Sequence, residues 1–279
     1  MKIAIVTDST AVIKKHDLNK FDNLYTIPLQ ILMGEDVYKD GIDLSSSEFF
    51  ELVRRYKTLP TTSQPSIGDV LVLFEELKTK YDQIIYLTIS SKISGTYSTG
   101  MLAKNQLDDD NVYVFDSLNT SVVLEMLSLK ACELVLEGYN AIEIVKYLEK
   151  MRDNSAIYLV VDDLKHLGRT GRVNNVSAVV GALLKIKPIL RFEDGVINLH
   201  KKIRTIAKAH SEVFELLSKE EIGSASCISI AHADGYEYAV KMRERILSIY
   251  PDKDIIINEL SPVISVHTGP KSLGVGWIK

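Results

Sequence analysis

Residues 84–96 read IIYLTISSKISGT, an apolar run that leads into a loop rich in hydroxyl groups. The run Ile84–Ile89 predicts a buried strand, and a helix is expected from Ser94 to about Leu107. The same order occurs at Ile3–Val6 and at Val112–Phe115, each of which is followed by an Asp-Ser pair. This alternation of strands and helices predicts a doubly wound α/β fold with a largely parallel sheet.

Three capping signals mark further helices in the first half of the chain. Each pairs Ser or Asn with an acidic residue three positions later, which satisfies free N–H groups of a first helical turn. The pairs are Ser45 with Glu48, Ser66 with Asp69, and Asn140 with Glu143. The stretch Leu118–Glu137 is apolar on nearly all sides and predicts a helix buried on several faces. Tyr25–Leu32 predicts one strand, and its Pro28 indicates an edge position.

The sequence changes character near Asp153, so we expect two domains, residues 1–153 with the ligand pocket and residues 154–279. Asp194-Gly195 at the centre of Ile189–Ile197 predicts a β-hairpin. The other expected elements are strands at Ile157–Val161, Cys227–Ala231, Asp254–Glu259 and Val263–Val266, and helices ending near Leu184, at Ala207–Leu217 and at Tyr236–Ile249. Together they predict a smaller, mixed α+β C-terminal domain.

The composition is that of a globular protein with a hydrophobic core. The 279 residues are 46% apolar and 25% charged, with a formal net charge of -4. This charge gives no indication of a nucleic-acid partner, although a transient contact with a membrane surface is compatible with it. With histidine counted as neutral, the longest run without a charged or amide side chain has twelve residues, whereas a bilayer span needs about twenty. We therefore expect no transmembrane segment.

Cys132 and Cys227 are the only cysteines, and each lies in an apolar stretch. Two isolated thiols form neither a disulfide framework nor a zinc site, so we expect both to be buried in a protein of the reducing cytoplasm.

Polar loops follow several expected strands, at the end of a parallel sheet where ligands bind. The candidate polar residues in these loops are Asp8, Ser9, Thr62, Ser63, Ser91, Ser94, Gly95 and Thr96. Helix capping is the alternative interpretation, and we favour it for Ser9 and Ser66. One cap needs one hydroxyl, however, and these loops supply three or four. Ser94 and Thr62 are therefore candidates to direct hydroxyl and backbone N–H groups at an anion.

The sequence patterns of common catalytic sites are absent. The chain contains no phosphate-binding loop, no glycine-rich dinucleotide fingerprint and no zinc-protease motif. Ser94 has no G-x-S-x-G surroundings, which argues against an α/β-hydrolase. The six histidines lack metal-ligand spacing, and we expect neither a metal nor a cofactor. Only His267 is a candidate by position, because it follows the expected strand Val263–Val266 and begins a Thr-Gly-Pro turn.

The segment from Lys165 to Lys208 is strongly basic. It holds ten Lys/Arg and two Asp/Glu, a local net charge of +8. A solvated basic face is one interpretation. The other is a docking surface for an acidic partner, with Arg169, Arg172 and Arg204 as candidate contacts.

Several of these motifs, in this order, resemble the DegV family over essentially the full length of the chain. The matching pieces are Thr7-Asp8-Ser9-Thr10, Thr62-Ser63-Gln64-Pro65-Ser66, Leu87–Ser91, Ser94-Gly95-Thr96-Tyr97, Asp116-Ser117, Gly171-Arg172, Lys185-Ile186-Lys187-Pro188, Arg204-Thr205 and His267-Thr268-Gly269. The chain is most similar to the FakB-type members, the fatty-acid-binding subunits of bacterial fatty acid kinase. The chain departs from the family pattern at His166–Thr170, just before Gly171-Arg172, where many members have Lys-Gly. This difference bears on the contacts with the kinase more than on lipid binding.

The resemblance implies a DegV-like two-domain fold with the ligand's head group where the domains meet. It implies that Thr62, Ser94 and His267 hold the carboxylate of one long-chain fatty acid, such as palmitate. It also implies a partner, an ATP-dependent kinase subunit, so the chain itself is expected to be a carrier and not an enzyme. Leu102, Val122 and Met126 are candidates to line the tail tunnel or to be plain core.

Two alternatives remain open from the residues. Ser94 and His267 could be the nucleophile and base of an acyl ester hydrolase, although no third orienting group or oxyanion hole is evident. The chain could also carry another amphiphile, such as a sterol or a polyprenyl lipid.

Overall fold

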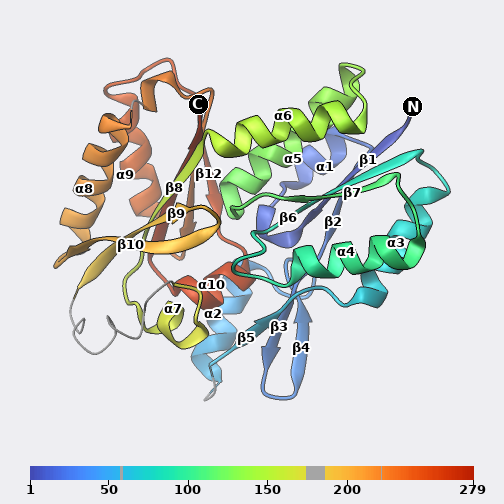
Figure 1. Ribbon diagram of the computed structural model, residues 1–279. Coiled ribbons are helices and arrows are strands. Elements are labelled where there is room, and N and C mark those ends of the chain that lie inside the picture. The colour runs from blue at the N-terminus through green and yellow to red at the C-terminus, as the bar shows by residue number, and fades with distance from the viewer. Residues whose placement is uncertain (57–58, 174–185, 221) are drawn as a thin grey trace.

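The first half of the chain contains a four-stranded parallel sheet with the strand order β2-β1-β6-β7 (Figure 1). The computed structural model describes residues 1–56, 59–173, 186–220 and 222–279. The strands of this sheet are β1 (Ile3–Asp8), β2 (Leu24–Ile27), β6 (Gln83–Thr88) and β7 (Val112–Asp116). The helices of this half that pack on it are α3 (Ile67–Lys78), α4 (Thr96–Leu107), α5 (Ser121–Leu136) and α6 (Ala141–Asp153).

Both faces of this sheet are buried. Successive side chains of a strand point to opposite faces, and in β1 each set packs into a different hydrophobic cluster. Ile3 and Ile5 of β1 belong to the hydrophobic cluster that includes α5 and α6. Ala4 and Val6 belong to the cluster formed with α3 and α4. The predicted doubly wound sheet is therefore confirmed.

A six-stranded mixed sheet forms the second half, in the order β10-β9-β8-β13-β11-β12. Its strands are β8 (Ser155–Val160), β9 (Lys187–Glu193), β10 (Val196–Ile203), β11 (Cys227–Ala233), β12 (Ile255–Glu259) and β13 (Ser272–Ile278). Only β11 and β12 pair in parallel among the described strands of this sheet. One face is covered by α8 (Ile206–Lys219) and α9 (Tyr236–Leu247).

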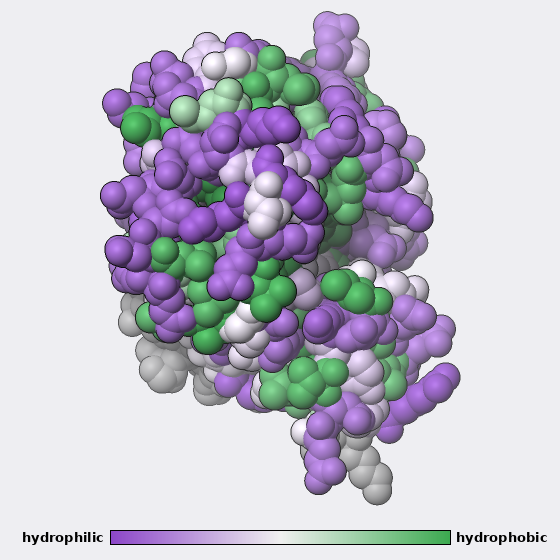
Figure 2. All heavy atoms as spheres, turned by 90° about the vertical axis from the view of Figure 1, so that its right-hand side faces the viewer, coloured by the Kyte–Doolittle hydropathy of each residue, from purple (hydrophilic) through white to green (hydrophobic). Residues whose placement is uncertain are grey.

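A small antiparallel sheet projects below these two, as Figure 1 shows. It has the order β4-β3-β5. Its strands are β3 (Gln30–Met33), β4 (Asp36–Lys39) and β5 (Thr61–Ser63), and the nearby helices are α2 (Ser46–Arg55), α7 (Lys165–Thr170) and α10 (Pro262–Thr268). In the described residues, the remaining short helices are α1 (Lys15–Lys20) and the 3₁₀ turns Ser9–Ala11 and Ile222–Ser224. On the face in Figure 2, apolar residues lie in separate groups among hydrophilic ones.

The helix α5 lies between the two large sheets and packs on both. Its contacts include β1 and β6 of the first sheet and β11 and β13 of the second. A glycine on β13 permits this approach, because a Cβ at Gly276 would lie 2.5 Å from Val122 Cγ2. The expectation that this helix is buried on several sides is confirmed.

One carboxyl group is buried in the packing of α5. Glu125 is 3% exposed and accepts a hydrogen bond from the side-chain amide of Asn258 on β12. Burial raises the pKa of Glu125 to about 8, since the charged form loses its hydration, and Lys14 opposes the shift only in part.

The local signals in the sequence were accurate in several places. Both capping boxes, at Ser45 and at Asn140, are formed, and Ser66 caps α3. The hairpin turns at Asp194-Gly195, as predicted. Cys132 is buried.

Four expectations about local structure were wrong. Val263–Val266 is not a strand but part of α10, because Ser261 caps the helix and Pro262 occupies its first position. Tyr25–Leu32 is split at Pro28 into β2 and β3, which belong to different sheets. Cys227 is exposed at the start of β11. Leu102 is 50% exposed on α4 and not a lining residue.

Other segments were missed or lie outside the described ranges. The sequence does not indicate β13, because Gly274 and Gly276 weaken a strand signal, and it predicts a loop where β5 lies. The helix expected to end near Leu184 falls within residues 174–185, outside the described residues. In the ranges that the structure does describe, no helix is long and apolar enough to cross a lipid bilayer.

The buried Glu125 makes stability depend on pH in a defined direction. The folded protein takes up a proton as pH falls through about 8, whereas the unfolded chain does so only near its ordinary pKa of 4.5. The free energy of unfolding should therefore rise by on the order of 1 kcal/mol from pH 9 to pH 7. Denaturant unfolding of E125Q should lack this rise, because glutamine keeps an acceptor for Asn258 without titrating.

E133Q, which changes an exposed glutamate of the same helix, is the matched control and should keep the rise. Equal pH dependence in the wild-type protein and E125Q would contradict this account of Glu125.

Candidate functional site

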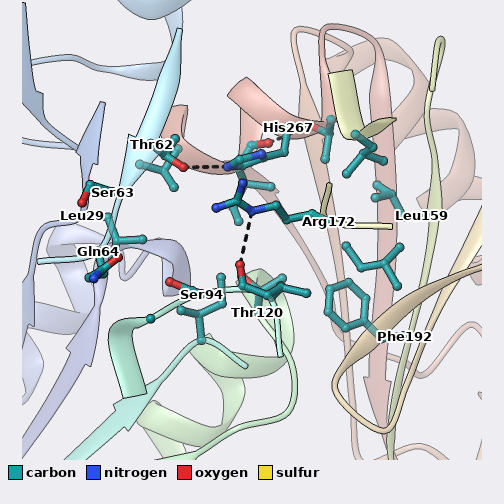
Figure 3. Close-up of a pocket in the computed structure, with 18 residues that line it drawn as sticks. Leu29, Thr62, Ser63, Gln64, Ser94, Thr120, Leu159, Arg172, Phe192 and His267 are labelled. Carbon is teal, nitrogen blue, oxygen red and sulfur yellow. Dashed lines mark hydrogen bonds between the residues drawn. The ribbon is translucent and has the colours of Figure 1, made fainter. Parts of the chain in front are cut away.

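A cavity lies where the carboxyl ends of the parallel strands meet the six-stranded sheet (Figure 3). The first sheet contributes loops that follow β2, β6 and β7, and the second sheet contributes β8, β9 and β10. Residues of β5, α7 and α10 complete the wall. The lining residues are Leu29, Thr62, Ser63, Gln64, Ile89, Ile93, Ser94, Gly95, Thr120, Leu159, Leu167, Arg172, Phe192, Ile197, Val263, Ile264, His267 and Thr268.

A hydrogen bond between Thr62 and His267 joins residues that are 205 positions apart. Thr62 Oγ1 lies 2.8 Å from His267 Nε2. Thr62 is held in β5 by its pairing with Ile31 of β3, and His267 lies in the last turn of α10. The two elements thus bring a hydroxyl and an imidazole to one wall of the cavity, as Figure 3 shows.

The His267 imidazole is neutral at physiological pH. The side chain is 9% exposed. Burial lowers its pKa to about 3, and the positive charges of Arg172 and Arg169 and the nearby His166 add to the effect. Its Nδ1 has no hydrogen-bond partner among the described residues. A neutral ring can donate or accept one hydrogen bond at each nitrogen according to its tautomer.

Ser94 lies at the start of α4, in the loop that follows β6. Its Oγ is 2.9 Å from Thr96 Oγ1 and also accepts from Thr96 N at 3.4 Å. Gly95 lies at the N-cap of α4, where a Cβ would come within 3.0 Å of the Gln64 side chain. The first N–H groups of a helix lack partners within it. Ser94 therefore presents its hydroxyl beside free backbone donors.

Asp8 and Ser9 belong to a buried network behind the cavity and do not line it. Asp8 accepts hydrogen bonds from Thr10 and from Ile89 N, the latter at 2.6 Å. Ser9 Oγ donates to Asp40 Oδ2 at 2.6 Å and accepts from Leu29 N at 3.0 Å. Asp8 and Asp40 therefore hold the polar loops in place and do not line the cavity.

Asp40 connects this network to α10. Its Oδ1 accepts from Val263 N at 3.1 Å, in the first turn of the helix that carries His267. Burial raises the pKa of Asp40 and of Asp8 to about 6 each. Without the hydrogen bonds, which oppose that shift, both carboxylates would be harder still to ionise.

The remaining expected polar residues divide into two groups. Ser63 and Gly95 line the cavity, and Thr96 contacts Ser94. Ser91 does not line the cavity, and its backbone N–H donates to Asp116.

Arg172 occupies a place that the sequence did not indicate. It was expected on a docking surface, but its side chain lines the cavity and reaches between His267 and Ser94 in Figure 3. Its Nη1 donates to Thr170 O at 2.6 Å and its Nε donates to Ile93 O at 3.4 Å. These two carbonyls hold the guanidinium in place, so the cavity wall carries a fixed positive charge.

The other two arginines lie outside the cavity wall. Arg169 is exposed and donates to Pro60 O at 3.1 Å, next to β5. Arg204 is exposed between β10 and α8. Exposed Lys201, Lys202 and Lys208 lie near it in the chain, which gives the described part of this segment a basic surface.

Most of the polar groups lie on one side of the cavity, with Leu29 among them, and apolar side chains of the six-stranded sheet lie on the other. Figure 3 shows Leu159 and Phe192 across from Thr62 and Ser63. Ile93, Ile197 and Leu167 extend the apolar wall. The sequence does not indicate Leu159, Phe192 and Ile197, because β8, β9 and β10 are distant in the chain from the polar loops. Val122 and Met126, the other expected tunnel residues, do not line the cavity.

This arrangement suits an amphiphile with a single anionic head group. Hydroxyl, imidazole and guanidinium groups can hold the head, and the apolar wall can receive a tail. A hydrolytic pair is not formed, because the hydrogen-bond partner of His267 is Thr62, while that of Ser94 is Thr96.

Comparison with known proteins agrees with this picture. A family model described as "Uncharacterised protein, DegV family" matches residues 2–279. The chain is 40% identical over 279 residues to Protein DegV of Bacillus subtilis, with 99% of each chain covered. It is also similar to the crystal structure of DegV, a fatty acid binding protein from Bacillus subtilis, with a TM-score of 0.91, 39% identity, and 100% of this chain and 99% of that chain covered.

A second solved structure has the same fold and concerns the same kind of ligand. It is described as fatty acid binding of a DegV family protein from Thermus thermophilus. The TM-score is 0.92 and the identity 29%, with 100% of both chains covered.

Proposed function

Because the chain belongs to the DegV family, we propose that it binds one long-chain fatty acid in the cavity between its two large sheets. The observation that carries this proposal is the division of the cavity into a polar side, with Thr62, Ser94 and His267, and an apolar side. The fatty acid binding described for the relatives from Bacillus subtilis and Thermus thermophilus supports it.

The tail supplies most of the affinity in this proposal. Burying one methylene is worth roughly 0.8 kcal/mol, so a 16-carbon acid gains on the order of 11 kcal/mol before the costs of binding. The polar residues then mainly orient the head group. Thr62 and Ser94 each offer a hydroxyl to a carboxylate oxygen, and neutral His267 fixes the Thr62 hydroxyl.

Arg172 changes the electrostatics expected of the head-group site. A site of only hydroxyl and imidazole groups would leave the carboxylate without a counter-charge. The guanidinium of Arg172 favours the ionised acid, and two of its N–H groups are already donated to backbone carbonyls. We expect it to attract the carboxylate without forming the bidentate pair that would reduce its nucleophilicity.

The FakB-type role extends this proposal to a partner. In that role the chain presents the carboxylate to an ATP-dependent fatty acid kinase subunit in the cytoplasm, which forms an acyl phosphate. The basic surface near Arg204 supports an acidic partner. A boundary at residue 153, with the head group where the two domains meet, also belongs to this proposal.

The first test examines the lipid and its head-group contacts. Native mass spectrometry of the gently purified protein should show one bound acid of about 14–18 carbons. Burial of a tail of that length contributes on the order of 10 kcal/mol, enough for the acid to remain bound through purification. T62A and S94A should fold normally but lower both lipid retention and acyl phosphate formation, each by about tenfold for one lost charge-assisted hydrogen bond.

S91A, which changes a serine of the same loop outside the cavity wall, is the matched control and should behave as wild type. Unchanged retention and turnover in both T62A and S94A would refute the assignment. A co-purifying sterol or polyprenyl lipid would replace the fatty acid as the ligand.

The second test examines the partner surface. R204E should lower kcat/KM for acyl phosphate formation by about tenfold at low salt, because charge reversal opposes the steering of an acidic kinase subunit. Trapping the product as a hydroxamate measures it. Lipid retention should not change.

K146E reverses an exposed charge on α6 and should have no effect on turnover. If R204E leaves kcat/KM for acyl phosphate formation unchanged at both low and high salt, Arg204 does not contact the kinase subunit. The proposal of fatty acid binding would not be affected.

A further inference from the structure

The helix α10 separates the fatty-acid cavity from a second cavity. Val263, Ile264, His267 and Thr268 line the first cavity, whereas Ser265, Val266 and Gly269 line the second. The two cavities share no lining residue in the described parts of the chain. The second cavity is therefore a separate feature of the fold.

The wall of the second cavity is mainly apolar. Its volume is about 220 Å³, many times the roughly 10–15 Å³ that a single water needs. The apolar side chains come from α2, from the residue before β5 and from α10. They are Phe49, Phe50, Val53, Pro60 and Val266. Phe49 and Phe50 meet edge to face at 5.2 Å, which leaves an aromatic surface in the wall.

A buried hydroxyl group in this wall has no partner. Ser265 is 2% exposed, and among the described residues its Oγ has no hydrogen-bond partner. A serine within a helix often bonds to the carbonyl four residues earlier, but Ser265 does not. A buried hydroxyl left unpaired is costly, so a ligand oxygen or an ordered water that reached Ser265 Oγ would be stabilised there.

The mouth of the cavity carries more positive than negative charge. Lys271 and Arg54 lie there, together with Asp234 and His166. Arg54 is paired with Asp234 at 3.5 Å across exposed side chains. Lys271 is exposed, which leaves its ammonium group accessible to a ligand at the mouth.

We propose that this second cavity binds a small aryl or short-chain alkyl carboxylate. The apolar part of such a molecule packs against Phe49, Val53 and Val266. Its carboxylate supplies an acceptor for the Ser265 hydroxyl and a negative charge for Lys271. The proposal stands on this cavity alone and does not depend on fatty acid binding in the first.

The probe for the test is 3-phenylpropanoate, added to the full-length protein with labelled Ile and Val methyl groups. Val53 and Val266 report on the second cavity, whereas Ile93 and Ile197 report on the first. We expect saturable shifts of the Val53 and Val266 methyl resonances at up to about 10 mM probe, the affinity range of small ligands. Ile93 and Ile197 should shift little.

Variants distinguish the contacts. S265A should weaken the probe about fivefold for one lost hydrogen bond, and K271Q should weaken it about threefold for one exposed charge. K146Q, at an exposed lysine on α6, should have no effect. V53W should fill the cavity and abolish binding, and T62A should leave it unchanged.

Three outcomes would overturn the proposal. They are no shift at the highest probe concentration, binding that T62A abolishes, and binding that both S265A and V53W leave intact. Since S265A keeps a good helix former within α10, its result counts even where V53W fails to fold.

Discussion

A buried carboxylate, Asp40, joins the parts of the chain that build the cavity. It accepts a hydrogen bond from Ser9 after β1 and another from Val263 N at the start of α10. Asp40 itself follows β4 of the small sheet, so it connects elements associated with all three sheets. A carboxylate at this depth is costly, as its raised pKa of about 6 indicates. Its bond with Val263 N ties the first turn of α10, which begins after the Ser261 cap, to the loop after β1, and α10 carries the His267 that meets Thr62.

The apolar side of the cavity depends on a second junction between the halves of the chain. Ser90 Oγ donates to Gly195 O at 2.7 Å, which ties the loop after β6 to the β9–β10 hairpin. A Cβ at Gly195 would lie 2.7 Å from that same hydroxyl. Glycine is therefore required, both for this approach and for the positive φ of 82°. The docked hairpin brings Phe192 and Ile197 to the cavity wall. Neither half of the chain forms the site alone.

Local chemistry predicted much of the fold, and long-range packing decided the rest. The capping boxes and the Asp194-Gly195 turn depend on neighbours within a few residues, so the sequence shows them. An apolar run of four such as residues 263–266 is ambiguous between strand and helix, and the Ser261 cap with Pro262 at the first position makes it a helix. Resemblance pointed to Thr62, Ser94 and His267, which do line one cavity. Arg172 was assigned to the surface, because no spacing pattern shows that α7 packs against α10 and leaves Arg172 beside His267.

A crystal structure of the purified protein with its co-purified lipid tests the central claim most directly. The account predicts a carboxylate within about 3 Å of Thr62 Oγ1 and Ser94 Oγ, with the tail running along Leu159 and Phe192. A cavity that holds no lipid, or a lipid whose tail lies at the Thr62 side and whose head lies at Phe192, would contradict it.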